Sequence, residues 1–537
     1  MPPIAPVQAP SATYFQLKTA YSRTGGAILS GTMKRIVTLI AVTLWSSFGA
    51  SAEVRLPHIL SSHMVLQRDR PMHFWGWADP DEKVTLTLDG QSAQSTADKL
   101  GKWSLYLPAH AAGGPFTIDV KGSNDLKIED VMIGDVWFAS GQSNMEMPLK
   151  GFPGNATIQD SAEEIQNADK PKLRLLLIQR KTSNYPLSDY QDTWTTCTPE
   201  TAADFSAVAY FFGRAISEKE NVTVGLIDST WGGTPGEAWT SFQGLTSDAS
   251  LMPVFSAWGA MMDEQVDMEL AQAADKRADE AAEKAHAPKP KHAWHPEPAS
   301  WGPAALYNGM VAPAIGYGIK GAIWYQGESN TGAERAPIYD KVFGAMITDW
   351  RRHWQEGNFP FLFVQIANFQ ASPADLWPTV RDAQRRTLSL ANTGMAVTID
   401  IGNPTNIHPA DKQSVGQRLA LAARSIAYGE KVEFSGPLFR QAGVDGHDMR
   451  VWFDHAEGLT AKGGATPEGF EIAGADRKYE PAAARLDGNS VVVSSPGVLE
   501  PKYVRYGWKD VPTVNLFNSA GLPASPFSSE ELLPGVN

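Results

Sequence analysis

The sequence contains a single cysteine, Cys197, among its 537 residues. One thiol cannot form an intrachain disulfide or a multi-cysteine metal site, and a lone cysteine is more often a small packing residue than a nucleophile. Basic residues are also in deficit, with 46 Lys and Arg against 59 Asp and Glu and a formal net charge of −13. Because nucleic-acid binding needs a broad basic face, we expect no nucleic-acid partner.

Long apolar runs are scarce as well. One short run, 36–45, follows the basic pair 34–35 and precedes the small residues 50–52. That order is typical of a secretory signal peptide with its cleavage site, and the run is too short for a convincing membrane span. No other stretch is long and apolar enough to cross a bilayer, so we expect a mature protein without a membrane span.

This interpretation divides the amino-terminal region. Met33 is the expected start, residues 1–32 would be an upstream extension without a structural role, and Glu53 would be the mature end. Residues 1–52 are therefore predicted to be this extension plus the signal peptide. The mature protein would be periplasmic or secreted, and nothing in the sequence indicates its oligomeric state.

The chain has enough apolar residues, 43% of the total, for a sizeable core. Residues 53–130 contain short β-forming runs between Asp-Gly, Gly-Lys and Gly-Gly turns, which predict an N-terminal β-sandwich module. From 131 to 430 short apolar strands alternate with helical stretches, as in a mostly parallel sheet covered by helices on both faces. Residues 431–537 are β-rich again and form the predicted C-terminal module. Strand candidates in the central domain are 135–139, 172–178, 222–227, 321–325, 361–366 and 395–401, and helix candidates are 205–218, 338–354 and 413–428.

An insertion is expected in the central domain at about 263–300. Residues 263–285 are rich in Ala, Glu and Lys, which favours a solvated helix, and a proline-rich stretch follows. His286, His292 and His295 lie there, and a metal site is conceivable. Loop histidines without acidic or cysteine partners at ligand spacing are more often solvated, so we expect no metal.

The stretch Gly141-Gln142-Ser143-Asn144 follows the strand candidate 135–139. Gly, Ser and Asn are ordinary turn residues, so a polar turn is one interpretation. A nucleophile is the other, because reactive groups of an α/β sheet gather at the carboxyl ends of its strands. A serine hydroxyl is a weak nucleophile at neutral pH and needs a base such as histidine.

Three further polar motifs also follow strand candidates. They are Trp231-Gly232-Gly233, Gln326-Gly327-Glu328-Ser329-Asn330 and Ile407-His408-Pro409. Glycines allow a backbone N–H to approach an oxyanion, an asparagine amide adds a side-chain donor, and a histidine supplies the base. The order Ser, Gly, Asn, His after successive strands therefore favours an acyl-transfer site over four unrelated loops.

These motifs resemble those of the SGNH hydrolases. More closely, they are similar to the sialate O-acetylesterase family and to related bacterial esterases that deacetylate plant polysaccharides such as xyloglucan. The resemblance spans roughly 54–430. It implies an SGNH-type, flavodoxin-like three-layer α/β/α domain between sandwich or jelly-roll-like β modules. It also implies a serine O-acetylesterase that acts on acetylated carbohydrate and needs no cofactor or metal.

By this resemblance Ser143 is the nucleophile and His408 is the base. The oxyanion hole would combine the N–H of Ser143, an N–H of Gly232 or Gly233, and the amide of Asn330. Losing one such donor typically costs ~2.7–4 kcal/mol of transition-state stabilisation. Five further residues are expected to bind substrate, although the last could equally lie on a solvated helix face; they are Gln142, Asn144, Gln326, Glu328 and Arg381.

The family pattern is broken at the residue that orients the histidine. Many SGNH enzymes carry an aspartate two or three residues before this histidine, where the present chain has Asn406 and Thr405. Neither side chain can hold a negative charge against an imidazolium. Asp400, at the end of the preceding strand candidate, is the expected substitute. The alternatives are Asp411, Glu328, or a dyad in which a backbone carbonyl orients the histidine.

Two other functions remain open at the level of sequence. A glycoside hydrolase could use Glu146 and Glu328 as paired carboxylates, since the two glutamates follow different strands. A non-catalytic glycan-binding protein would explain two β modules rich in Trp and Tyr. Neither alternative explains the serine-centred motifs. For the esterase, both acetylated polysaccharide and O-acetyl sialic acid remain candidate substrates.

Overall fold

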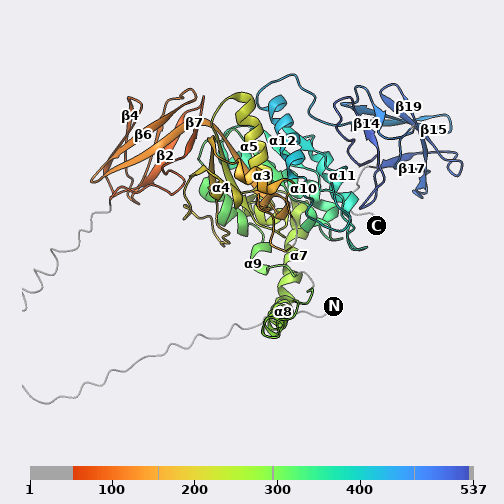
Figure 1. Ribbon diagram of the computed structural model, residues 1–537, viewed down its shortest axis with the longest axis horizontal. Coiled ribbons are helices and arrows are strands. Elements are labelled where there is room, and N and C mark those ends of the chain that lie inside the picture. The colour runs from red at the N-terminus through yellow and green to blue at the C-terminus, as the bar shows by residue number, and fades with distance from the viewer. Residues whose placement is uncertain (1–52, 155–156, 293–294, 465, 531–537) are drawn as a thin grey trace, which may run out of the picture. The chain divides into compact units, whose positions relative to one another are not determined.

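The computed structural model describes residues 53–154, 157–292, 295–464 and 466–530. The predicted upstream extension and signal peptide, residues 1–52, lie outside the described residues. Along the chain, a β region is followed by a central α/β region and then by a second β region (Figure 1).

The first β region contains two groups of strands around one core. β2 pairs with β5, while β3 pairs with β4 and β6. Phe74, Leu105 and Leu86 are buried in the shared core, as alternate residues of a strand with one face inward should be. The strands are β1 (Val65–Gln67), β2 (Met72–Trp77), β3 (Lys83–Leu88), β4 (Gln91–Thr96), β5 (Lys102–Leu107) and β6 (Gly113–Lys121).

A long strand, β7 (Asp125–Gly141), continues from this region into the central sheet. Its first part pairs with β6 in antiparallel fashion, and its last part pairs in parallel with β10 and β11. The expected module boundary at residue 130 therefore falls inside one continuous strand.

The central sheet has the strand order β13-β12-β11-β7-β10-β8-β9. Its neighbours pair in parallel, except for the antiparallel edge pair β8–β9. Because the chain crosses to both sides of β7, the carboxyl end of β7 is where an open α/β sheet offers a ligand site. The remaining strands are β8 (Lys170–Leu177), β9 (Thr195–Cys197), β10 (Val224–Thr230), β11 (Gly321–Tyr325), β12 (Phe361–Val364) and β13 (Thr393–Ala396).

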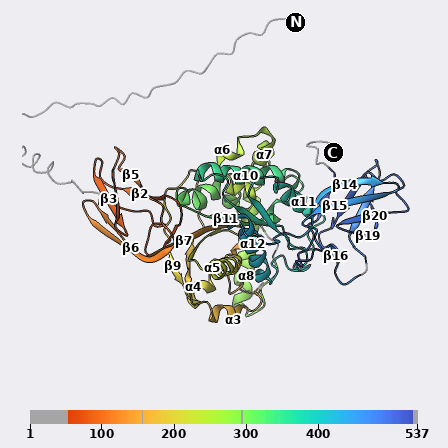
Figure 2. The same ribbon diagram turned by 90° about the horizontal axis from the view of Figure 1, so that it is seen from above.

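Helices cover both faces of this sheet. α5 and α12 pack with one set of alternate strand residues, including Trp137 and Ile323, and α10 and α11 pack with the other set, including Phe138 and Trp324. Figure 2 shows α10 and the α5–α12 pair on opposite sides of the central strands. The predicted α/β fold class is thus confirmed. The described α-helices outside the insertion are α2 (Ser143–Glu146), α3 (Ser161–Gln166), α4 (Pro199–Ala203), α5 (Ala207–Glu220), α6 (Phe242–Leu245), α9 (Pro298–Trp301), α10 (Tyr339–Trp354), α11 (Trp377–Thr387) and α12 (Lys412–Ile426).

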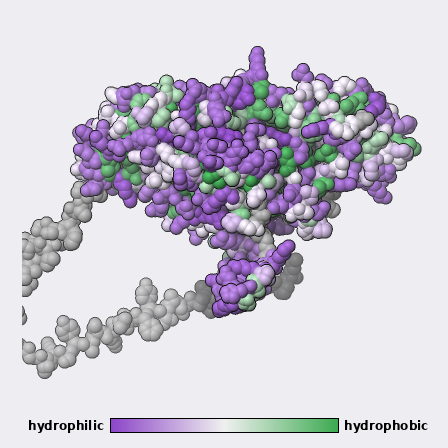
Figure 3. Space-filling view, in the orientation of Figure 1, coloured by the Kyte–Doolittle hydropathy of each residue, from purple (hydrophilic) through white to green (hydrophobic). Residues whose placement is uncertain are grey.

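The insertion consists of α7 (Met252–Asp263), α8 (Gln265–Lys284) and the stretch that follows. α8 buries none of its residues, and its surface is hydrophilic (Figure 3), so the predicted solvated helix is confirmed. His292 does have acidic partners, because its ring nitrogens lie 3.0 Å from Asp275 and 2.8 Å from Asp279. Within the described ranges, no group of three or more His, Cys, Asp or Glu residues could hold a metal ion.

The second β region contains two four-stranded sheets, with orders β14-β15-β20-β19 and β18-β17-β21-β23. Val491, Phe470 and Tyr506 belong to the core that both sheets share. None of the helices that the structure describes is long and apolar enough to span a bilayer. The strands are β14 (Leu438–Asp445), β15 (Asp448–Asp454), β16 (Thr460–Ala461), β17 (Phe470–Ala473), β18 (Glu480–Pro481), β19 (Ala483–Asp487), β20 (Ser490–Ser494), β21 (Tyr503–Tyr506), β22 (Leu516–Phe517) and β23 (Phe527–Ser528).

Candidate active site

Ser143 lies immediately beyond the carboxyl end of β7. Gly141, the last residue of β7, has φ 137°, and a Cβ at this position would come within 2.2 Å of the Tyr325 carbonyl oxygen. Only glycine therefore allows β7 and β11 to approach this closely before the chain turns. Ser143 then begins the short helix α2, half-buried between the buried Gln142 and Asn144.

His408 reaches this serine from the loop between β13 and α12. Its Nε2 lies 2.9 Å from Ser143 Oγ, although the two residues are 265 positions apart. Burial, with a smaller contribution from the positive charge of Lys412, lowers the pKa of His408 to about 4. The imidazole is therefore neutral at neutral pH and, with Nε2 facing the hydroxyl, can accept its proton.

The other ring nitrogen of His408 is not held by Asp400. Nδ1 is buried and has no hydrogen-bond partner among the described residues. Asp400 instead pairs with Arg418, whose Nη1 and Nη2 each lie 2.7 Å from one carboxylate oxygen. Asp411 accepts hydrogen bonds from the N–H and hydroxyl of Ser414 at the start of α12. The structure thus joins serine and histidine but does not bring the predicted acid to them.

Asn406 occupies the place where the family pattern expects an aspartate. Its Oδ1 accepts a hydrogen bond from the backbone N–H of His408 at 2.9 Å. The amide therefore fixes the backbone of the histidine rather than its ring. The arrangement is a serine–histidine pair without a carboxylate on the outer ring nitrogen.

The predicted oxyanion donors differ in how they are used. A Cβ on Gly232 would lie 3.1 Å from the Cβ of Ser143, so the glycine is next to the serine. Its N–H, however, donates to Glu146 Oε2 at 2.8 Å. The N–H groups of Ser143 and Gly233 carry no hydrogen bond to any described residue. These two groups are the donors left for a developing oxyanion.

Asn330 is fully buried behind this loop. Its Oδ1 accepts from Gly236 N and Gln326 Nε2, which settles the orientation of the amide. Its Nδ2 donates to Glu237 at 2.8 Å, and Glu237 in turn pairs with Arg335. One of the two amide hydrogens is therefore committed to the protein, and the other has no acceptor among the described residues.

Two predicted substrate-binding glutamines are structural instead. Gln326 is fully buried, donates to the Thr234 carbonyl and accepts from the Tyr339 hydroxyl. Gln142 is 2% exposed, and its Oε1 accepts from the N–H of Ser329 at 3.2 Å. Both amides hold the loops around the serine, so neither side chain is available to substrate.

Asn144 and Glu328 belong to a buried polar network that also contains Lys412, a residue that the sequence did not predict at the site. Asn144 Nδ2 donates to Glu328 Oε1 at 2.6 Å and to the Ile407 carbonyl at 3.0 Å. Its Oδ1 accepts from Lys412 Nζ at 2.5 Å. Burial raises the pKa of Glu328 and lowers that of Lys412 to about 7. Asn144, the residue after Ser143, therefore holds Ile407, the residue before His408.

Arg381 was also predicted to face substrate, and the structure places it in the interior instead. It is fully buried, and its donors reach the Ile366 and Ala367 carbonyls after β12. Other donors reach the carbonyls of Lys509 and Asp510, in the loop after β21. The guanidinium thus fixes the last β region to the central sheet and does not bind substrate.

Glu146 was considered only as a glycosidase carboxylate. Its Oε1 accepts from Arg180 Nε at 2.7 Å, and its Oε2 holds Gly232. Glu328, the other glutamate of that hypothesis, is already bonded to Asn144. Since both carboxylates hold parts of the serine site, the geometry favours an esterase over paired-carboxylate chemistry.

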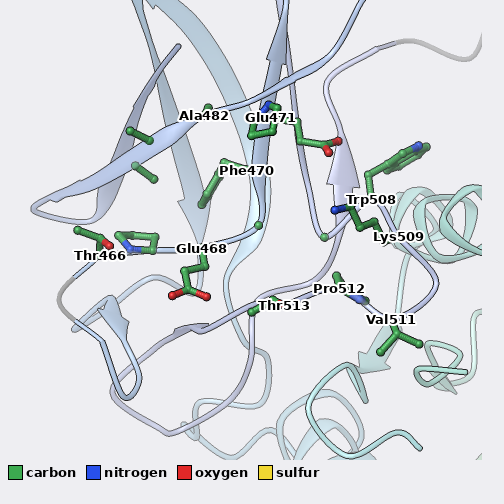
Figure 4. Close-up of a pocket in the computed structure, with 16 residues that line it drawn as sticks. Thr466, Glu468, Phe470, Glu471, Ala482, Trp508, Lys509, Val511, Pro512 and Thr513 are labelled. Atoms are coloured by element: carbon green, nitrogen blue, oxygen red, sulfur yellow. The ribbon is translucent and has the colours of Figure 1, made fainter. Parts of the chain in front are cut away.

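The cavity shown in Figure 4 does not identify this site. A cavity of about 510 Å³ lies in the second β region (Figure 4), where Phe470, Trp508 and Glu468 are among its lining residues. Neither Ser143 nor His408 lines it. The site is therefore recognised from the side-chain geometry at the sheet edge.

Known proteins resemble the chain in sequence and in structure. Residues 285–425 match a family model described as carbohydrate esterase, sialic acid-specific acetylesterase. Sialate O-acetylesterase from Homo sapiens is 30% identical, over 74% of this chain and 76% of that protein. The Mus musculus protein of the same name is 31% identical, over 75% of this chain and 79% of its own length.

A solved structure supports the same assignment. A carbohydrate acetylesterase from Xanthomonas citri is 38% identical, with a TM-score of 0.76, and the match covers 89% of this chain and 99% of that one. The resemblance found in the four motifs is thereby confirmed. The chain belongs to the sialate O-acetylesterase family of carbohydrate esterases and is a carboxylic ester hydrolase.

Proposed function

We propose that this carbohydrate O-deacetylase removes O-acetyl groups from glycans with Ser143 as nucleophile and His408 as general base. The observation that carries the proposal is the 2.9 Å contact between Ser143 Oγ and His408 Nε2 at the carboxyl end of the central sheet. A neutral imidazole in hydrogen-bond contact with a serine hydroxyl is the arrangement that activates this nucleophile.

The reaction has two halves. Ser143 Oγ attacks the acetyl carbonyl carbon while His408 Nε2 takes the hydroxyl proton, and a tetrahedral oxyanion forms. The imidazolium then gives that proton to the departing sugar oxygen as the ester bond breaks, which leaves an acetyl-serine. Water attacks the acetyl group with the same base, and acetate leaves with regeneration of the serine.

The oxyanion would receive its hydrogen bonds from the N–H groups of Ser143 and Gly233 and from the remaining amide hydrogen of Asn330. All three belong to the predicted set. The N–H of Gly232 is excluded from this role as long as it donates to Glu146. Each donor lost is expected to cost ~2.7–4 kcal/mol of transition-state stabilisation.

The acetylated substrate class is either a plant-type polysaccharide, such as xyloglucan, or O-acetyl sialic acid. The matched relatives include sialate O-acetylesterases and a carbohydrate acetylesterase, and these names support an acetylated carbohydrate as substrate. A side-by-side assay of acetate released from acetylated xyloglucan, acetylated xylan and O-acetyl sialic acid distinguishes them.

The mechanism is tested with Ser143→Ala in the same assay. We expect loss of acetate release with an unchanged circular dichroism spectrum, and full activity for Ser425→Ala, which removes a half-buried hydroxyl from α12. Retained activity of Ser143→Ala would overturn the mechanism. Release of reducing sugar ends from a de-esterified glycan would instead favour a glycoside hydrolase.

We also propose that the enzyme is exported. The proposal rests on the basic pair, short apolar run and small residues within 34–52. Fractionation of cells that produce the full chain should place acetylesterase activity in the periplasm or medium, with a mature end at Glu53. Activity confined to the cytoplasm would contradict it.

A further inference from the structure

The outer face of the β2–β5 strand pair carries aromatic side chains where polar residues are the rule. In β2, the buried Phe74 alternates with the half-buried His73, Trp75 and Trp77, and Trp75 also packs against the edge of the core. An antiparallel pair with one face on the core normally presents polar residues on the other face. On the partner strand Tyr106 also points outward and is 60% exposed.

Three of these rings form an ordered stack rather than a loose cluster. The His73 ring lies 4.8 Å from Trp75 and 4.5 Å from Tyr106, with interplanar angles of 22° and 14°. The imidazole is itself fixed, because its Nε2 lies 2.8 Å from Ser104 Oγ and its Nδ1 lies 3.0 Å from the Gly316 carbonyl. The flat surfaces are therefore held in place before any ligand arrives, which reduces the entropy lost on binding.

A cavity of about 360 Å³ lies against this face. His73, Trp75 and Trp77 line it together with the polar side chains of Asp98 and Ser188. Its volume is in the range of small-molecule sites, which combine apolar walls with a few placed polar groups. None of the residues of the serine–histidine site lines it.

The chemistry of the face suits a pyranose sugar. Such a ring has flat C–H faces that pack on aromatic rings and a rim of hydroxyl groups that bond to polar side chains. A carboxylate and a serine hydroxyl beside three aromatic residues provide both kinds of contact. The net charge of −13 argues against a nucleic acid as the stacked ligand.

We propose that the outer face of β2 and β5 is a second carbohydrate-binding site, which holds a neutral glycan chain on Trp75 in the cavity and on the exposed ring of Tyr106 beside it, with His73 stacked on both rings. The choice of a glycan, rather than another ligand with flat apolar faces, rests on the proposed function. The site anchors the polysaccharide that carries the acetyl groups and takes no part in breaking the ester.

Binding is measured by calorimetry with three neutral probes that lack acetyl groups: xylohexaose, cellohexaose and a de-acetylated xyloglucan oligosaccharide. We expect the full-length enzyme to bind at least one of them and Trp75→Ala to weaken that affinity about tenfold, or ~1.4 kcal/mol. Trp75→Tyr keeps an aromatic face and should retain most of the affinity. Absence of binding to all three probes, or unchanged affinity of Trp75→Ala, overturns the proposal.

Trp452→Ala is the matched control. Trp452 is also a half-buried tryptophan that alternates with core residues along a strand, β15, but no ring of the described chain stacks on it. Its replacement should leave glycan affinity unchanged. If Trp75→Ala fails to fold, the exposed Tyr106→Ser replaces it, and unchanged affinity of that variant overturns the proposal.

A second assay separates this site from the ester chemistry. Trp75→Ala should hydrolyse 4-nitrophenyl acetate at the wild-type rate while its kcat/KM on an acetylated polysaccharide falls several-fold. An equal loss on both substrates would indicate a structural role and overturn the anchoring function. If the wild type binds glycan but releases no acetate, the proposed mechanism fails and the binding site stands.

Discussion

Ser143 and His408 meet at one hydrogen bond but are supported in different ways. Ser143 directly follows β7, which pairs in register with β10 and β11 on both sides up to Gly141. His408 lies in the loop 397–411, where side-chain amides hold the backbone. Ser143 is therefore placed by the sheet, and His408 is placed by a set of polar contacts from distant segments.

Side-chain amides hold successive backbone groups of the loop that carries His408. Asn403 donates its N–H to the Asn368 carbonyl and accepts at Oδ1 from the N–H of Asn406. Asn406 accepts from the N–H of His408, and Asn144 donates to the Ile407 carbonyl. Substitutions within the paired end of β7 should thus damage the fold, whereas those that release the loop of His408 should change rate or pH dependence with the fold intact.

The largest effect on activity is expected from removal of the base. His408→Ala should lower kcat by a factor on the order of 10⁴ to 10⁶, because serine then loses the group that takes its proton. Steady-state acetate release provides the measurement, and the exposed His447→Ala is the control. The double variant with Ser143→Ala should be no worse than either single variant, since the pair acts as a unit; additive losses would contradict that.

On the serine side, Gly141→Ala should break the fold rather than the chemistry. The φ of 137° and the 2.2 Å approach to the Tyr325 carbonyl together predict a loss of at least ~3 kcal/mol in the free energy of unfolding. Gly90 has a φ of 75°, but the space around an added Cβ is open. Gly90→Ala should therefore lower the free energy of unfolding by only ~1 kcal/mol. Urea unfolding measures both; equal losses would show that backbone strain alone sets the cost.

Asn144→Ala, which removes a hydrogen bond to the loop of His408, should reduce kcat by roughly 10- to 100-fold with little change in KM. It releases the Ile407 carbonyl and leaves the buried Lys412 and Glu328 without their shared partner. The control is Asn392→Ala, which removes an exposed amide bonded to the Asn358 carbonyl. A kcat within twofold of wild type would show that the network does not position the base.

The same contrast explains what could be read from the sequence. β11 has the bounds that its apolar run predicts. The position of Ser143 just after a strand was likewise predicted from the apolar run before it, because both features depend on neighbouring residues in the sequence. For the run 395–401, the predicted end of the strand was wrong. Val397 and Ile399 are buried as predicted, yet β13 ends at Ala396. The hydrophobic run therefore indicated which residues are buried but not how far the strand continues its hydrogen bonds with the sheet. Because the strand was expected to continue to residue 401, Asp400 was expected beside His408.

Another group of misses involves charged side chains in the interior. Arg381 and Lys412 are each at most 1% exposed, and such residues are almost always assigned to the surface from sequence alone. Arg381 is satisfied by carbonyls from the loops after β12 and β21, and Lys412 by an amide 268 positions away. Contacts between such distant residues leave no periodic signal in the sequence. The sequence could therefore predict that Ser143 and His408 meet, but not the residues that hold them in place.

The smallest expected effect is a shift in pH dependence caused by Asn406→Asp. His408 must be neutral to act as base, and its pKa of about 4 predicts that kcat/KM is lost only in acid, near that pH. An aspartate keeps the acceptor for the His408 N–H and adds a negative charge, which stabilises the imidazolium and raises its pKa. The acid limb of kcat/KM should therefore move to higher pH by about one unit. Asn392→Asp, with the same charge in an exposed position, should leave it in place, and a shift of the Asn406→Asp limb toward lower pH would show that the loop rearranges instead of retaining the wild-type contact.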